Sequence, residues 1–238
     1  MTYIILAAGR GKNLQPLTIN HPKTLYKLDH DTTVLQRLVR TIRHYDKDAE
    51  IVAVIGFMYQ SIVKELEEEN VLFVQNPFYS VTGSLGSLWF ARDYLQRESV
   101  TIINGDIVFG EDLVKDILCL KTDFPYVLVD SSHTEKIKYN VQVQGEKVCV
   151  MSRNLTDFFA NYSSVTKLDA VSSRFLSEQL DSMVNDGMYD LFFEDALVQM
   201  IFESDFELFY KDIKGYEWTE IDNVDDLLRA REIQRKRV

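Results

Sequence analysis

The chain has 238 residues, of which 26 are Lys or Arg and 37 are Asp or Glu, so its formal net charge at pH 7 is −11. This acidic balance argues against nucleic acid as a partner, and a polyanionic substrate must meet local basic groups. No apolar run approaches the length of a membrane span, and Met1 leads directly into an apolar strand. We therefore expect a soluble, cytoplasmic protein without a membrane partner. Cys119 and Cys149 have no neighbouring histidine pattern, so neither a zinc site nor a disulfide framework is expected.

The first predicted element is a short apolar strand over residues 3–6, which leads into a basic loop of small residues. The loop's small residues are Ala7, Ala8, Gly9 and Gly11, and the nearby cations are Arg10, Lys12 and Lys23. Backbone N–H groups that are exposed between small residues, together with positive charge, suit a triphosphate. The spacing matches neither the G-x-G-x-x-G fingerprint nor a Walker loop. The loop predicts a polyphosphate cradle, and the alternative is a tight turn with solvated lysines.

Helices and strands alternate along the first half of the chain. Apolar residues at helical spacing predict helices over residues 34–45, 59–69 and 85–95, and apolar runs predict strands over 51–55, 71–74 and 100–103. This βαβ rhythm indicates an α/β fold with a three-layer, Rossmann-like, mostly parallel twisted sheet and right-handed crossovers. Ligands of such sheets bind beyond the carboxyl ends of the strands.

The pattern changes from Pro125 onward. Antiparallel strands are predicted over residues 126–129, 140–143 and 147–150, with Gly145 in a hairpin turn. Helices over 173–185 and 194–203, a strand over 206–211 and a last helix over 224–236 complete the chain. With no proline-rich linker, one domain over residues 1–238 with a small antiparallel lobe from about 125 to 215 fits better than two independent domains.

Two groups of carboxylates are candidates for a cation site. Asp106 ends the N-G-D segment directly after a predicted strand, where it is well placed to hold Mg²⁺ beside the phosphate loop. Glu220 and Asp222 flank Ile221 in an extended segment, so both carboxylates share one face while Ile221 faces the core. The alternatives are turn chemistry for the N-G-D segment and helix capping by Asn223, whose helix carries Asp225 and Asp226 in its first turn.

The segment LAAGRGKNLQPLT, followed by HPKTL, resembles the signature loop of nucleotidyltransferases that join an NTP to a sugar phosphate or alcohol phosphate. The resemblance implies a nucleotide-diphospho-sugar transferase-like fold and an Mg²⁺ ion on Asp106 and Asp222. It implies nucleotide contacts at Leu6, Ala7, Ala8, Gly9, Gly11, Lys12, Lys23 and Gly105, with Lys23, Asp106 and Asp222 as the catalytic residues. Asn13 replaces the family's signature arginine, and the sequence leaves open whether Lys12 or Arg10 supplies that charge.

Residues 76–91, NPFYSVTGSLGSLWFA, are similar to a stretch of choline-phosphate and phosphonate cytidylyltransferases of bacteria. The middle of that stretch contacts the nucleotide base, which implies base contacts at Thr82, Gly83, Ser84 and Ser87. Gly83, Ser84 and Gly86 depart from the family's two asparagines and tyrosine. Thr82 or Ser84 can also cap the helix that follows.

The segment FEDA at residues 193–196 is similar to the Y-E-D-A segment of the same enzymes, whose acidic and aromatic residues face the acceptor. The resemblance implies acceptor contacts at Glu194, Asp195 and Glu220, and at Arg153, which replaces a family lysine. Aromatic rings with carboxylates suit an ammonium group, although rings at helical spacing are also ordinary core residues.

The implied reaction is transfer of CMP, or another NMP, from an NTP to a small phosphorylated alcohol or phosphonate, with release of pyrophosphate. CTP is the favoured nucleotide, and a cell-surface precursor is the expected product class. The alternatives are a sugar-1-phosphate nucleotidyltransferase and a catalytically silent, nucleotide-binding regulatory protein. The sequence leaves the acceptor, the pathway and the formation of a homodimer open.

Overall fold

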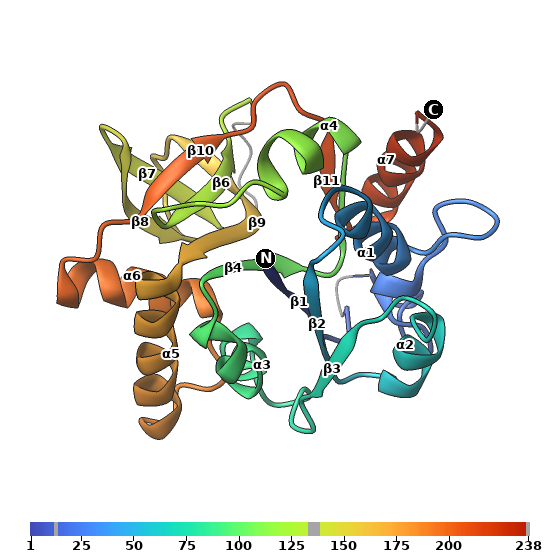
Figure 1. Ribbon diagram of the computed structural model, residues 1–238, viewed down its shortest axis with the longest axis horizontal. Helices are drawn as coiled ribbons and strands as arrows, with labels where there is room; N and C mark the ends of the chain where they lie inside the picture. Colours follow the sequence, from blue (N-terminus) through green and yellow to red (C-terminus); the bar gives the residue numbers. More distant parts are fainter. Residues whose placement is uncertain (12–13, 133–138, 237–238) are drawn as a thin grey trace. The chain divides into compact units, whose positions relative to one another are not determined.

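The computed structural model describes residues 1–11, 14–132 and 139–236 (Figure 1). The chain forms two compact units, each assembled from separated segments. The first unit comprises Met1–Val81, Ile103–Leu120 and Tyr216–Val238, and the second comprises Thr82–Ile102 and Lys121–Gly215. Both contain helices and strands, so the α/β class expected from the alternating pattern is confirmed.

The first unit contains a parallel sheet in the order β3-β2-β1. Its strands are β1 (Thr2–Ala7), β2 (Glu50–Ile55) and β3 (Leu72–Gln75). Parallel pairing places Ala7 beside Ile55 and Ile55 beside Gln75, so the carboxyl ends of all three strands meet at one edge. The glycine-containing loop leaves β1 at this edge. Ligands of open α/β sheets bind at the carboxyl ends of the strands, so the loop lies where a ligand is expected.

Helices α1 (Val34–Tyr45) and α2 (Tyr59–Glu65) belong to the same unit. The α1 helix begins with a capping box, in which the Thr33 hydroxyl accepts from the Gln36 N–H and the Gln36 side chain accepts from the Thr33 N–H. The α2 helix ends four residues before the predicted boundary at residue 69. Its expected last turn holds three consecutive glutamates, and their negative charge opposes the negative end of the helix dipole.

The remaining part of the first unit is built from short elements. They are β5 (Ile107–Phe109), α4 (Glu111–Leu113), a π-helical turn (Val114–Leu118), β11 (Trp218–Glu220) and α7 (Val224–Arg235). Strands β5 and β11 pair antiparallel, with Glu220 opposite Ile107. The sequence predicted an extended segment only around Ile221 and no strand over residues 107–109, because three residues are too few to establish a period.

In the second unit five strands pair in the order β9-β6-β10-β8-β7, and β7 also pairs with β9, so the ladder closes on itself. The strands are β6 (Tyr126–Asp130), β7 (Asn140–Gln144), β8 (Lys147–Ser152), β9 (Ala160–Asp169) and β10 (Phe209–Asp212). β4 (Ser99–Asn104) runs from this unit into the first. The sequence does not predict β9, because polar side chains hide its strand character. Its buried residues include Asn161, Ser163 and Lys167.

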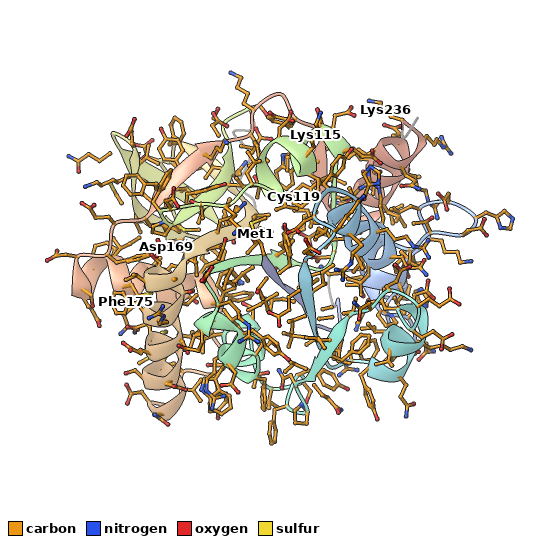
Figure 2. The ribbon with its side chains drawn as sticks, viewed as in Figure 1. Met1, Lys115, Cys119, Asp169, Phe175 and Lys236 are labelled. Atoms are coloured by element: carbon orange, nitrogen blue, oxygen red, sulfur yellow. The ribbon has the colours of Figure 1, made fainter. Side chains whose placement is uncertain are left out.

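Three helices complete the second unit: α3 (Ser84–Phe90), α5 (Ala170–Asn185) and α6 (Phe193–Ser204). Figure 2 labels Asp169 at the start of α5 and Phe175 within it. The Asp169 carboxylate accepts hydrogen bonds from Val171 and Ser172, which caps the helix. α3 ends earlier than predicted and continues as a 3-10 helix over Arg92–Gln96. Within the described ranges, no helix has the length and apolar character required to cross a bilayer.

Candidate active site

A cluster of three carboxylates lies in the first unit. Asp106, Glu220 and Asp222 each offer one oxygen, and these oxygens all lie within 4.8 Å of one another. Asp106 and Glu220 are buried, and Asp222 is half-buried. The sequence predicted Asp106 and Asp222 as metal ligands and Glu220 as an acceptor contact. The fold therefore places Glu220 together with the two metal candidates.

The pairing of β5 with β11 builds this cluster. Asp106 directly precedes β5, and Ile221 directly follows β11. The Ile221 N–H donates to the Asp106 carbonyl at 3.0 Å, which extends the ladder and holds the two segments in register. Ile221 is fully buried in an apolar cluster with Leu14 and Val108. Burial of Ile221 orients its two acidic neighbours to the opposite face, as the alternation of the E-I-D segment predicted.

Neighbouring polar groups hold the carboxylates in place. The Asn104 side chain donates to Glu220 Oε1 at 3.3 Å. Asn223 Oδ1 accepts from the Asp226 N–H at 3.0 Å, which confirms Asn223 as the cap of α7. The Asp226 carboxylate in turn accepts from the N–H groups of Asp222 and Asn223. The start of α7 thus fixes the backbone that carries Asp222.

Lys23 supplies the positive charge beside these acids. Its ammonium forms an ion pair with Asp106, lies 3.4 Å from Asp222 Oδ1 and donates to the Ile221 carbonyl at 3.3 Å. The residue opens a short 3-10 helix, Lys23–Leu25, after Pro22. Only 16% of its side chain is exposed, so its charge acts where water screens weakly.

The three carboxylates fit a hard divalent cation. Mg²⁺ takes oxygen ligands and is commonly held by one or two carboxylates together with substrate phosphates. Oxygens from Asp106, Glu220 and Asp222 lie close enough to share one ion. The Lys23 ammonium already shows that this position attracts a cation.

The loop that follows β1 offers small residues at the carboxyl edge of the sheet. Gly9 is exposed, and a side-chain carbon added to it would meet nothing within 4 Å. Gly11 has a φ of +61°, which favours glycine, and its carbonyl accepts from the Thr18 hydroxyl at 2.6 Å. Arg10 lies 5.4 Å from the centroid of the Phe57 ring. Lys12 and Asn13 lie outside the described residues.

Gly105 packs closely against the end of β1. Its N–H donates to the Leu6 carbonyl at 2.9 Å, and an added carbon would approach the Ala7 side chain and the Leu6 carbonyl to 3.1 Å. A side chain at this position would therefore require β1 or its neighbours to shift by a few tenths of an ångström. Ala7 and Ala8 are buried, and the Ala8 carbonyl accepts from the Phe57 N–H.

The predicted base-contact segment lies in the second unit, where much of its backbone is already hydrogen-bonded. Gly83 donates its N–H to the Tyr189 carbonyl, and its own carbonyl accepts from Ser87. The expectation that Thr82 or Ser84 caps α3 is wrong, because Gly83 occupies the cap position without a side-chain hydrogen bond. Ser84 Oγ instead accepts from the Phe193 N–H at 3.0 Å, at the start of α6. Ser87 is buried within α3.

Contacts with the chain before α6 explain two departures from the family pattern. A side-chain carbon on Gly83 would overlap the Leu191 carbonyl oxygen, and one on Gly86 would lie 2.8 Å from the Tyr189 carbonyl oxygen. Neither the asparagine nor the tyrosine of the related enzymes fits this backbone. Gly83 and Gly86 therefore serve close packing of α3 against residues 189–191.

The acceptor candidates of the second unit form a cluster at the start of α6. The Arg153 guanidinium lies 3.5 Å from the ring centroid of Phe192 and 5.4 Å from that of Tyr139. The Tyr139 hydroxyl donates to Asp195 at 2.9 Å, and the other Asp195 oxygen accepts from the Phe192 N–H. Burial, and then the negative charges of Glu194 and Asp195, raise the pKa of the Tyr139 phenol well above its usual range.

A glycine-containing loop after the first strand of a parallel sheet, with a lysine and three carboxylates in the same unit, defines a nucleotide-handling α/β protein. Residues 3–174 match the model of the MobA-like NTP transferase domain, and the chain belongs to this family.

Comparisons with individual proteins extend this result. The chain is 23% identical over 234 residues to a choline-phosphate cytidylyltransferase of Streptococcus pneumoniae, covering 98% of both chains. It is 25% identical over 138 residues to the CTP:phosphoglutamine cytidylyltransferase of Campylobacter jejuni, covering 56% of this chain and 53% of that protein. A solved CTP:phosphocholine cytidylyltransferase from S. pneumoniae shares the fold with a TM-score of 0.79, 22% identity and 98% coverage of both chains. The predicted nucleotidyltransferase resemblance and fold are confirmed.

Proposed function

We propose that this nucleotidyltransferase transfers CMP from CTP to a small phosphorylated alcohol or phosphonate and releases pyrophosphate. The observation that carries the proposal is the joint position of Lys23 and the carboxylates Asp106, Glu220 and Asp222. Two cytidylyltransferases among the relatives, one of them similar over almost the whole chain, support CTP as the nucleotide.

In this reaction an oxygen of the acceptor phosphate or phosphonate attacks the α-phosphorus of the NTP in line, and the bond to pyrophosphate breaks. The acceptor oxygen is already anionic near neutral pH, so the protein needs no covalent nucleophile. Its task is to align two anions and to offset their repulsion. Backbone N–H groups at Gly9 and Gly11, together with Lys12, hold the β and γ phosphates, and Lys23 neutralises charge that develops on the α-phosphate.

Asp106, Asp222 and Glu220 are the residues that would hold Mg²⁺. When bound, such an ion supplies Lewis-acid stabilisation of phosphoryl oxygens. Asn104 orients Glu220, and Asp226 orients the backbone at Asp222. Positioning of this kind is typical of the groups around metal ligands.

The lobe of residues 125–215 is proposed to bind the acceptor. Arg153 presents a guanidinium for an anionic group, and Glu194 presents a buried carboxylate for an ammonium. Asp195 accepts from Tyr139 and from the Phe192 N–H, so we assign it to holding the aromatic side chains of this cluster in place. Thr82 and the start of α3 remain the proposed base contacts.

A substrate screen tests the proposal directly. CTP, UTP, dTTP and GTP are each combined with choline phosphate, aminoethylphosphonate, other alcohol phosphates and hexose 1-phosphates, and pyrophosphate release is measured. We expect release with CTP and a small alcohol phosphate or phosphonate. Release only with a hexose 1-phosphate would establish the sugar nucleotidyltransferase instead. Nucleotide binding without release in any combination would identify a silent regulatory protein.

A further inference from the structure

Lys23 lies where the proposed reaction needs a different cation. Its ammonium contacts Asp106 and Asp222, two of the three carboxylates that are proposed to hold the metal. The proposed reaction also requires the same ammonium at the α-phosphate. A metal ion bound between these carboxylates would compete with the ammonium for the same carboxylate oxygens.

We propose that Lys23 is a built-in counter-ion of the nucleotide-free protein, and that it releases the carboxylates when a metal–nucleotide complex binds. The site then takes the metal–NTP complex as its substrate and binds the free ion weakly. This inference rests on the proposed function, because it assumes that the carboxylates bind a metal.

The charges of the site explain why such a counter-ion is needed. Asp106 and Glu220 are 5% and 8% exposed, and three carboxylate oxygens lie within 4.8 Å of one another. Like charges at this separation in a poorly solvated place repel strongly. The Lys23 ammonium offsets that repulsion without a bound ion.

The exchange leaves no charge without a partner. A lysine is a compact charge on a flexible stem, so its ammonium can move while its backbone stays in place. The backbone of Lys23 is held by the hydrogen bond from the Tyr26 N–H to its carbonyl. The carboxylates exchange an ammonium for a metal ion, and the ammonium exchanges the carboxylates for a phosphate of the bound nucleotide.

Metal binding without nucleotide tests the inference. Mn²⁺ binding is measured by calorimetry on the full chain and on the Lys23→Met variant, which keeps the aliphatic stem and loses the charge. Lys27→Met is the matched control, because Lys27 is exposed and donates only to the His30 carbonyl among the hydrogen bonds described. We expect Lys23→Met to bind Mn²⁺ at least ~10-fold more tightly than the unchanged protein, which equals about 1.4 kcal/mol. Lys27→Met should bind like the unchanged protein.

A thermal measurement gives a second readout. In a chelator, Lys23→Met should melt at a lower temperature than Lys27→Met, and Mn²⁺ should raise its melting temperature more. Lys23→Gln serves as the second variant if Lys23→Met does not fold. Equal or weaker Mn²⁺ binding by the Lys23 variants would overturn the inference and leave the proposed metal site intact. Absence of binding in every protein would remove the metal site itself and the inference with it.

Discussion

The carboxylate of Asp226 accepts a hydrogen bond from the backbone N–H of Asp222 at 3.0 Å. It also accepts from the Asn223 N–H at 3.1 Å, so one side chain both caps α7 and holds a candidate metal ligand. Helix capping and the active site are therefore coupled at this point of the chain.

Replacement of Asp226 by alanine should weaken stability and metal binding together. Loss of the reciprocal cap is expected to lower the free energy of unfolding by about 1 kcal/mol. In the Lys23→Met background, which is expected to bind the free ion, the freed backbone at Asp222 should also weaken Mn²⁺ binding in calorimetry. Asp225→Ala is the matched control, because Asp225 is exposed and lies in the same helical turn. Equal effects of both variants on metal binding would contradict a positioning role for Asp226.

Lys23→Ala and Asp106→Ala should each lower kcat/KM by at least ~10²-fold, as expected when a positioned charge at the reacting phosphate is lost. Initial rates of pyrophosphate release at saturating acceptor measure the effect, and circular dichroism checks that each variant is folded. Lys27→Ala controls for loss of an exposed lysine four residues along the chain from Lys23. A folded Asp106→Ala variant with near-normal turnover would rule out its assignment to the metal.

Glu220→Gln separates the two roles that are open for Glu220. As a metal ligand, Glu220 should set the Mg²⁺ concentration needed for half-maximal activity, which we expect to rise by ~10-fold or more in the variant. The KM for the acceptor should then stay unchanged. Glu217→Gln, in the same segment, is the control, since Glu217 pairs with Lys236 outside the cluster. A higher KM for the acceptor with an unchanged Mg²⁺ requirement would instead assign Glu220 to acceptor binding.

Local signals made several parts of this site predictable. The apolar run of β1, the helical spacing of α1 and the cap at Asn223 each depend on a few neighbouring residues, and the structure has all three where the sequence placed them. The alternation around Ile221 predicted that Glu220 and Asp222 share a face.

Other parts depend on contacts that sequence spacing does not reveal. The meeting of Glu220 with Asp106 requires β5 and β11 to pair across more than one hundred residues. Ser84 accepts from Phe193 instead of capping its own helix, because the chain before α6 packs against the start of α3. The pairing of Lys23 with the carboxylates is likewise a product of the fold.

The glycines Gly9 and Gly83 should respond differently to alanine. An added carbon at Gly9 meets nothing within 4 Å, so Gly9→Ala should leave the free energy of unfolding nearly unchanged. It should raise the KM for CTP, because a side chain blocks close approach of phosphate to the backbone. Gly83→Ala should destabilise the fold by about 1–3 kcal/mol through overlap with the Leu191 carbonyl. Urea titrations and CTP kinetics measure both effects. An unchanged KM for CTP in Gly9→Ala would contradict the phosphate cradle.

Tyr139 makes the free energy of unfolding depend on pH in the alkaline range. Burial, followed by the charges of Glu194 and Asp195, raises its pKa in the folded protein above the unfolded value of about 10. The unfolded chain therefore loses the phenol proton first, so this contribution to stability is complete below pH ~10 and falls as the pH rises. The loss reaches at most about 1.4 kcal/mol per pH unit for this group.

Tyr139→Phe should flatten the decline of the free energy of unfolding above pH ~10, because the variant has no phenol proton to release. At neutral pH the variant should be about 1 kcal/mol less stable, since the hydrogen bond to Asp195 at 2.9 Å is lost. Urea titrations at neutral pH and at alkaline pH measure both quantities, and Tyr189→Phe controls for removal of an exposed phenol. If Tyr139→Phe declines as steeply as the unchanged protein, the alkaline sensitivity belongs to other buried tyrosines, of which Tyr126, with a pKa raised to about 12 by burial, is the next to test.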